Sequence, residues 1–300
     1  MSEDVPEFLR ALDEPTRNVY RAGLSLFQNF YGKPLSKFLD AVEEDLGKPR
    51  RQRQRVAANT LRAFGRWLEE SSYAPKTVRA YLASVQSLGR YYEIPISMRY
   101  VRMPPALPKS KKFPWTLEKI SEFMGYLRWI DVKALAGCLF QSGLSVSDAL
   151  ALTYGDIQRE YEEGIVPLCF DLVRIKTDTP HMTFIGKFAY QLLDEYLKAR
   201  GKLRPEDPLF ALSQRTVRFH FERAAERMLG KIGERNPCSP HSLRSAFRTL
   251  LRDADAPEEY VEFWMGHNIG GDIRKVYTRH SRDGWRKVYA QFEPYLTPKG

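Results

Sequence analysis

The stretch "QSGLSVSDALALTYGDI", residues 141–157, reads as a small-residue turn, a helix start, an apolar run and a second turn. Ser145 lies at the centre of the first turn, and Asp148 follows three residues later. Serine before an apolar run is typical of a helix N-terminus. The function of this turn has to be inferred from the charged and reactive residues in the rest of the chain.

Length and composition indicate a folded chain of two domains. Three hundred residues exceed one typical domain, and 43% hydrophobic and 13% aromatic residues suffice for real cores. No run approaches 18 apolar residues, so we expect no transmembrane helix. The acidic N-terminus lacks a signal-peptide core, which favours a cytoplasmic location. Three scattered cysteines fit reduced core thiols: Cys138, Cys169 and Cys238.

The charge balance suits a polyanionic partner. Lys plus Arg number 47 against 37 Asp plus Glu, which gives a net charge of +10 and a pI near 9.4. Such an excess is expected of a nucleic-acid-binding protein. A soluble protein that is merely basic fits the same numbers.

The first hundred residues predict a helical bundle. Apolar residues recur at three- and four-residue spacing in 14–32, 54–72 and 74–94. Gly32 should end the first of these helices and Pro75 should begin the third. We interpret the basic segment 47–55 as a solvated helix start.

A Pro-rich, basic linker at 108–114 separates a helical domain, 1–107, from a second domain, 115–300. Lys109, Lys111 and Lys112 give the linker a charge that could follow a phosphate backbone.

The second domain is predicted to be mostly helical with one strand region. Residues 164–187 are rich in β-branched and aromatic side chains around the turn "KTDTP". A hairpin with its tip near 176–180 should form a small antiparallel sheet. Helices are expected at about 186–200, 213–230, 241–254 and 257–266. The fold class is therefore mainly α with a small antiparallel sheet.

A histidine and an arginine could bind a phosphate. "PHSLRSAFRTLL" places His241 and Arg244 three residues apart, on one face of a helix. A guanidinium fork binds two phosphate oxygens at once. His267 follows a glycine and precedes a Gly-rich loop. A surface pair explains the H-x-x-R spacing equally well in isolation.

A tyrosine and a lysine could carry covalent chemistry. Tyr277 lies ten residues after His267 among basic residues, which favour a nucleophilic phenolate. Lys176 begins the hairpin turn, where it could protonate a leaving oxygen. A packing tyrosine and a solvated lysine are the structural alternatives.

The sequence offers little support for a metal or nucleotide site. Cys238, His241, His267 and His280 could bind a metal, but they lack tight paired spacing. No P-loop or dinucleotide glycine pattern is present.

Taken in order, these pieces resemble the tyrosine recombinase (phage-type integrase) family, with an archaeal or viral branch as one candidate origin. The ordered motifs are "SGLSVSD", "IKTDTP", "HSLR", "MGH" and "VYTRH", and the resemblance covers roughly residues 115–285. The N-terminal part resembles the family's core-binding domain, above all "APKTVRAYLASVQSLGRYY".

The resemblance implies an enzyme that cuts and rejoins double-stranded DNA at specific sites without a cofactor. It implies a helical core-binding domain and an α+β catalytic domain, which clamp a duplex as a tetramer. A cytoplasmic, nucleoid-associated protein follows, or one in the host cytoplasm if the source is viral.

The resemblance also implies a role for each matching residue. Tyr277 would attack the scissile phosphate and form a 3′-phosphotyrosyl link with a free 5′-hydroxyl. Arg244 and His267 would bind the non-bridging oxygens. His241 would assist proton transfer from the tyrosine, and Lys176 would protonate the leaving 5′-oxygen.

Ser145 departs from the family, because it occupies the position of the first catalytic arginine, with Asp148 as its supporting acid. No arginine lies between Arg128 and Arg159 to replace it locally. A serine supplies neither charge nor a fork, and the loss of such a donor costs about 10²–10³ in rate. A degenerate relative, a deliberate substitution or a distant arginine would explain it. We expect impaired cleavage, which Ser145→Arg should raise by about two orders of magnitude.

Two other functions remain compatible with the sequence. A type IB topoisomerase shares the Arg, Lys, His and Tyr set, and a non-cleaving DNA-binding or regulatory protein would explain Ser145. The amphipathic tail 284–296 could pack on its own domain or on a neighbour. Besides the linker lysines, the candidate DNA-binding residues are Arg50, Arg51, Lys76 and Arg79.

Overall fold

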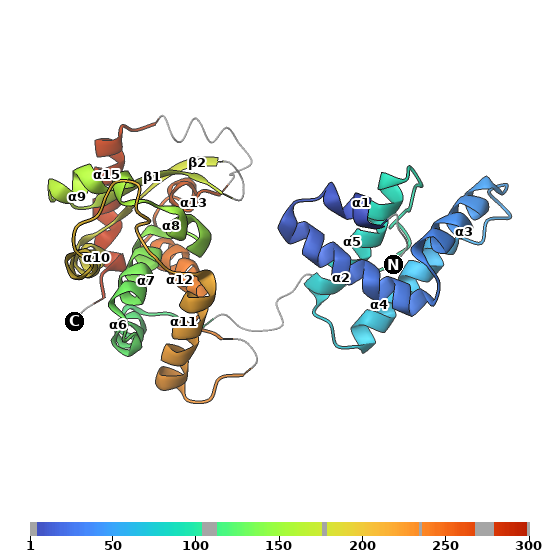
Figure 1. The fold of residues 1–300 in the computed structure, drawn as a ribbon, viewed down its shortest axis with the longest axis horizontal. Coiled ribbons are helices and arrows are strands. Elements are labelled where there is room, and N and C mark those ends of the chain that lie inside the picture. The colour runs from blue at the N-terminus through green and yellow to red at the C-terminus, as the bar shows by residue number, and fades with distance from the viewer. Residues whose placement is uncertain (1–4, 104–112, 176–178, 234–235, 268–278, 299–300) are drawn as a thin grey trace. The chain divides into compact units, whose positions relative to one another are not determined.

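The chain folds into two compact units, Met1–Lys111 and Lys112–Gly300. The structure is a computed structural model that describes residues 5–103, 113–175, 179–233, 236–267 and 279–298 (Figure 1). The three linker lysines lie outside the described residues. Along the described chain, no helix is long and apolar enough to cross a membrane.

The N-terminal unit is built from helices. The helix α2 begins after the N-cap Asp13 and ends at Gly32, whose φ of 72° is the left-handed conformation that glycine adopts without strain. Pro75 is the first residue of α5. The predicted helix stop and start are therefore confirmed. The described helices are α1 (Val5–Arg10), α2 (Glu14–Tyr31), α3 (Leu35–Gly47), α4 (Val56–Glu70) and α5 (Pro75–Tyr91).

An aromatic cluster holds this unit together. The ring centroid of Phe27, on α2, lies 4.8 Å from that of Phe38 and 5.1 Å from that of Phe64, both edge-on. All three side chains are fully buried. Edge-to-face pairs of this kind contribute about 0.5–1.5 kcal/mol each beyond the burial of apolar area. The unit thus has a core of its own.

The sequence predicted that the basic segment 47–55 begins a helix, and this prediction is wrong. The segment is a connection between α3 and α4, and α4 begins only at Val56. Pro49 cannot donate a helical hydrogen bond, and Arg55 has a φ of 55°, outside the right-handed helical region. Arg50 and Arg51 are exposed in this connection, and Lys76 and Arg79 are exposed on α5.

The second unit contains one hairpin among helices, which confirms the predicted fold class. Strand β1 (Leu168–Arg174) pairs antiparallel with β2 (Thr179–Ile185), and Arg174 lies opposite Thr179. The described helices are α6 (Leu117–Tyr126), α7 (Ile130–Ser142), α8 (Val146–Ala151), α9 (Gln158–Glu162), α10 (Lys187–Arg200), α11 (Gln214–Leu229), α12 (Pro240–Asp253), α13 (Glu258–Trp264) and α15 (Arg282–Phe292). Short 3₁₀ turns cover Tyr154–Asp156 and Glu293–Leu296.

Helix α7 is the central element of this unit. It packs against α10, α12 and β2, and every residue from Ala134 to Ser142 is buried. A helix that is apolar on all sides is stable only inside a core. Its end at Gly143, with a φ of 65°, turns the chain directly into α8 and so places Ser145. The most buried helix therefore fixes the turn that the sequence singled out.

The side chain of Gln141, at the end of α7, ties three segments together. Its Oε1 accepts a hydrogen bond from the backbone N–H of Ala189 at 2.9 Å, and its Nε2 donates to the carbonyl of Leu296 at 2.9 Å. Its own carbonyl accepts the hydroxyl of Tyr289 at 2.7 Å. Tyr289 and Trp285 of α15 are fully buried. In this chain the amphipathic tail packs on its own unit.

Gln141→Leu should destabilise the second unit by about 2–5 kcal/mol. The substitution keeps the volume but leaves the amide of Ala189 and the carbonyl of Leu296 buried without a partner, at about 1–3 kcal/mol each. Urea unfolding followed by tryptophan fluorescence measures the change in midpoint.

Gln191→Leu is the matched control, because Gln191 is exposed on α10. It should shift the free energy of unfolding by less than about 0.5 kcal/mol. Equal midpoints for the two variants would show that the Gln141 contacts do not hold the tail.

Candidate active site

Ser145 caps helix α8 and binds the residue that was expected to support an arginine. Its Oγ accepts the backbone N–H of Asp148 at 3.2 Å, and its hydroxyl donates to Asp148 Oδ2 at 2.7 Å. Asp148 is buried, and its Oδ1 accepts the backbone N–H of Ile175 at 3.1 Å. The Asp148 carboxylate therefore joins the start of α8 to the end of the hairpin strand β1.

Arg244 is the most buried arginine of the site. It lies on α12 and its residue is 4% exposed. Its Nη1 donates to the carbonyl of Gly143, and its Nη2 donates to the carbonyl of Met265 at 2.5 Å. Burial, and then the repulsion from Arg174, lower the pKa of Arg244 to about 10. The guanidinium stays charged at neutral pH and is held rigidly by backbone oxygens.

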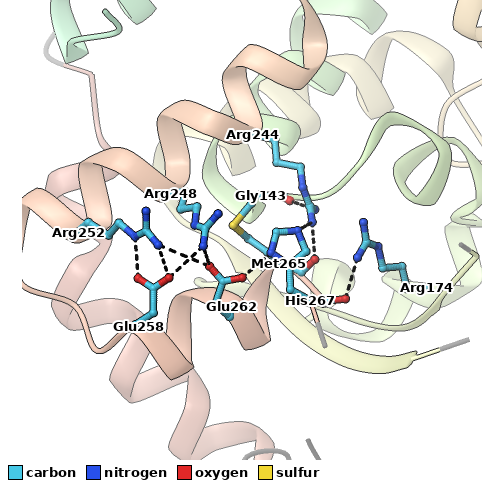
Figure 2. Close-up of polar contacts among 10 residues, drawn as sticks. Gly143, Arg174, Arg244, Arg248, Arg252, Glu258, Glu262, Met265 and His267 are labelled. Carbon is cyan, nitrogen blue, oxygen red and sulfur yellow. Dashed lines mark hydrogen bonds and ion pairs between the residues drawn. The ribbon is translucent and has the colours of Figure 1, made fainter. Parts of the chain in front are cut away.

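Arg244 and Glu262 together decide which nitrogen of His267 carries the proton. Arg244 Nη2 lies 2.8 Å from His267 Nε2, and because arginine only donates, Nε2 must accept. His267 Nδ1 lies 2.5 Å from Glu262 Oε2, so Nδ1–H donates to that carboxylate. Figure 2 shows this chain of contacts. A carboxylate behind the ring stabilises the imidazolium, whose Nε2–H could then donate to an anion.

A series of ion pairs between α12 and α13 holds the Glu262 carboxylate in place, on the side away from His267. Arg248, one helical turn after Arg244 on α12, pairs with Glu262 and lies 3.0 Å from Glu258 Oε1. Arg252 donates through Nε to Glu258 Oε2 at 2.6 Å (Figure 2). The pair with Arg252 lowers the pKa of Glu258 to about 2. These contacts lock α12 to α13, which leads into His267.

A cavity of about 560 Å³ opens beside Arg244, between α8, α11 and α12. Its lining includes Ser145, Arg218, Glu222, His241 and Arg244. His241 is exposed in the first turn of α12, one turn before Arg244, as the H-x-x-R spacing predicted. The structure thus places Ser145, His241 and Arg244 along one cavity, and His267 is hydrogen-bonded to Arg244.

Two predicted residues, Lys176 and Tyr277, lie outside the described residues. Two other tyrosines that follow α12 pack against the core of this unit. Tyr289 is fully buried, and burial raises its pKa well above the usual value. Tyr260 packs its ring edge-on to Trp285, with centroids 5.0 Å apart.

Sequence reasoning missed three residues of this site: Arg174, His181 and Glu262. His181 is fully buried on β2, its ring nitrogens make no hydrogen bond to described residues, and burial lowers its pKa to about 4. A side-chain Cβ at Gly266, where φ is 63°, would lie 2.9 Å from the His181 ring. The one available signal was charge within apolar segments, such as Arg174 at the end of "LCFDLVR".

Residues 116–283 match the family model described as "Phage integrase family". The match covers more than half of the chain, and the chain belongs to this family. The resemblance inferred from the ordered motifs is thereby confirmed.

Curated relatives extend the likeness over most of the chain. The tyrosine recombinase XerC of Bradyrhizobium diazoefficiens is 25% identical over 287 residues, which covers 88% of this chain and 86% of the relative. The tyrosine recombinase XerD of Halalkalibacterium halodurans is 24% identical and covers 81% and 84%. Both likenesses include the N-terminal unit.

Solved structures share the fold. A lambda integrase (75–356) dimer bound to a COC′ core site gives a TM-score of 0.59 at 14% identity, covering 88% of this chain and 93% of that one. The XerH site-specific recombinase bound to palindromic difH substrate gives 0.56 at 18% identity, covering 79% and 72%. At these identities the likeness concerns the fold.

Glu262→Gln should lower the pKa of His267 further below its ordinary value. Burial already lowers this pKa, and the Glu262 carboxylate opposes that effect by stabilising the imidazolium. The amide keeps a hydrogen-bond acceptor but removes the charge. An NMR titration of the five histidine rings measures the shift and reports whether Nδ1 carries the proton.

Glu259→Gln is the control, because Glu259 lies on the same helix and pairs with Arg279, away from the Glu262 contacts. It should leave the His267 titration unchanged. A His267 pKa that is unmoved in Glu262→Gln would contradict the assigned proton position.

Proposed function

We propose that this protein is a site-specific DNA recombinase whose nucleophile is Tyr277 and whose phosphate-binding centre is built around Arg244. The buried guanidinium of Arg244 beside a cavity that also exposes His241 is the observation that carries the proposal. Family membership and tyrosine recombinase relatives support the reaction class.

The geometry suits stabilisation of a pentavalent phosphorane. Arg244 uses three hydrogen bonds to Gly143, Met265 and His267, out of the five N–H groups of a guanidinium. Donors fixed before the reaction stabilise developing charge without the cost of reorganisation. When a phosphate arrives, a protonated His267 would turn its Nε2–H from Arg244 to a non-bridging oxygen, with Glu262 behind the ring.

The reaction proceeds by exchange of phosphodiester bonds. The Tyr277 oxygen attacks the phosphorus, its proton passes toward His241, and the 5′-oxygen leaves with a proton from Lys176. The 3′-phosphotyrosyl link conserves the bond energy, so a 5′-hydroxyl of another strand reverses the step. A type IB topoisomerase would use the same step within one duplex, but the curated relatives are named recombinases.

The N-terminal unit serves, in this proposal, as the core-binding domain. Its exposed Arg50, Arg51, Lys76 and Arg79 supply charge for the phosphate backbone. The linker lysines would add further positive charge. Recombination joins two duplexes, so we infer that several copies, four in the simplest arrangement, assemble on DNA.

Tyr277→Phe should abolish covalent capture of DNA while leaving DNA affinity within about threefold. Binding selection from a duplex library with a randomised segment yields the recognised site. A nicked version of that duplex traps the covalent intermediate, which denaturing electrophoresis detects.

The phenyl ring keeps the shape of the tyrosine and removes only the attacking oxygen. Mass spectrometry of the trapped peptide locates the attachment, and Tyr260→Phe is the matched control, which should retain capture. An adduct on another tyrosine would remove Tyr277 from the role. Tight binding without any adduct would favour the non-cleaving alternative.

The DNA affinity should fall steeply with salt, and the N-terminal unit should account for part of the slope. Each neutralised phosphate contributes about 0.9 to the log–log slope. Replacing Arg50, Arg51, Lys76 and Arg79 by glutamine should therefore reduce the slope by up to about 3.6. Fluorescence anisotropy between 50 and 300 mM salt, roughly the range over which such slopes are measured, gives both values.

Lys198→Gln is the control, because Lys198 is already paired with Asp194 at 2.7 Å on α10. Its slope should equal that of the unchanged protein. An unchanged slope in the fourfold variant would exclude these residues from the interface.

A further inference from the structure

Arg174 is an arginine that the end of strand β1 turns inward. Its neighbours Val173 and Ile175 are 54% and 61% exposed, whereas the Arg174 side chain is only 13% exposed. Arginine is rarely buried to this degree unless it is paired. The contacts of Arg174 should therefore show which groups balance its charge.

Those contacts satisfy the guanidinium only in part. Arg174 Nη1 donates to the carbonyl of Gly266 at 2.9 Å. Its Nε is 3.8 Å from Asp148 Oδ2, is buried, and makes no hydrogen bond to described residues. Its Nη2 likewise makes none within the described part of the chain. The guanidinium has donors to spare next to a single carboxylate.

The carboxylate beside Arg174 is the one that Ser145 binds. Asp148 Oδ2 accepts the Ser145 hydroxyl at 2.7 Å and faces Arg174 Nε. The sequence placed Ser145 where the family has its first catalytic arginine, with Asp148 as the support. The structure thus puts a guanidinium against the same acid, contributed by β1 instead of by α8.

Arg174 and Arg244 both donate hydrogen bonds to backbone carbonyls of the turn that follows α13. Arg244 binds the carbonyl of Met265, and Arg174 binds the carbonyl of the next residue, Gly266. Figure 2 shows the two side chains reaching the turn at His267 from different sides. The two guanidinium groups are close enough for Arg174 to contribute to the lowered pKa of Arg244.

Among the described residues, the carboxylates near Arg174 and Arg244 leave this pair with unbalanced positive charge. Asp148 faces Arg174, while Glu262 is already engaged by Arg248 and His267. Two close guanidinium groups repel each other unless an anion lies between them or beside them. The spare N–H groups of the Arg174 guanidinium, beside this charge, are therefore suited to donate hydrogen bonds to an anion.

We propose that Arg174 contacts the scissile phosphate and provides the second guanidinium that position 145 lacks. The proposal rests on the proposed function, since it names a further catalytic residue of the same site. Arg174 donates hydrogen bonds to a non-bridging oxygen and transfers no proton. The bonds formed and broken stay those at phosphorus, between the Tyr277 oxygen and the leaving 5′-oxygen.

This proposal changes the expectation for Ser145. With Arg174 in place, the chain as written cleaves DNA, and Ser145 serves as helix cap and partner of Asp148. An arginine at position 145 would compete with Arg174 for Asp148 and bring a third positive charge beside Arg244. Ser145→Arg should therefore change covalent capture by less than about tenfold, against the hundredfold gain that the sequence alone suggests.

The test measures covalent capture on the nicked, selected duplex by five full-length proteins, which include Ser145→Arg alone. Relative to the unchanged chain, Arg174→Ala should lose about 10²–10³-fold in rate, the cost of one transition-state donor. Ser145→Arg in the Arg174→Ala background should recover at least tenfold of that loss. Arg159→Ala, at an arginine that is 85% exposed on α9, should have no effect.

The rescue separates catalysis from support of the fold. If Arg174 only held the Gly266 carbonyl, an arginine on α8 would not restore the rate. Three outcomes would each overturn the proposal. Arg174→Ala could capture DNA within threefold of the unchanged rate, or Ser145→Arg alone could gain a hundredfold. The third outcome is a double variant that still binds DNA but recovers none of the lost rate.

A second measurement keeps the test independent of cleavage. Inorganic phosphate titrated into the full chain, followed by NMR of the His267 ring, should bind at least tenfold more weakly to Arg174→Ala. Equal affinities would overturn the proposal even if a double variant fails to fold. An unchanged chain that binds phosphate through Arg174 but never forms an adduct would refute the recombinase function and leave the anion site standing.

Discussion

The burial of the Arg244 guanidinium is the constraint on which the site depends. A charged group inside a protein is tolerated only where fixed polar groups replace water. Here the replacements are the carbonyls at Gly143 and Met265, which end two different helical segments. The same contacts that make the charge tolerable therefore set the positions of the turn at Ser145 and the turn at His267.

From this arrangement the electrostatics of the whole centre follow. Arg244 occupies Nε2 of His267, so the proton goes to Nδ1 and requires an acceptor, which Glu262 provides. Glu262 in turn needs Arg248, and the series of ion pairs continues to Glu258. Each group is placed by its neighbour, which suits a centre that must meet the charge of a transition state without rearranging.

Helix ends, one helix face and the hairpin could be predicted from the sequence, because each depends on local chemistry. Gly32 and Pro75 mark helix ends through backbone rules that act within a few residues. The H-x-x-R spacing predicted that His241 and Arg244 share a helix face, and both line one cavity. The strand pattern predicted the hairpin. These features depend on neighbours in sequence.

The features that escaped prediction depend on a contact between distant segments or on the exact geometry of a turn. Arg174 approaches Asp148 only because β1 ends beside α8, and Glu262 approaches His267 only when α13 has turned into the following glycine. Buried helix α7 shows no periodicity because it is covered on every side. Lys176 and Tyr277 lie outside the described residues, so their places in the site stay predictions.

The tether at Gln141 has a consequence for the order of events during synthesis. Leu296, Tyr289 and Trp285 complete the core around α7, yet they are synthesised well after that helix. The N-terminal unit, with its own aromatic core, can fold while translation continues. The second unit cannot close before its tail emerges. A nascent chain would therefore hold a folded N-terminal unit before the second unit closes.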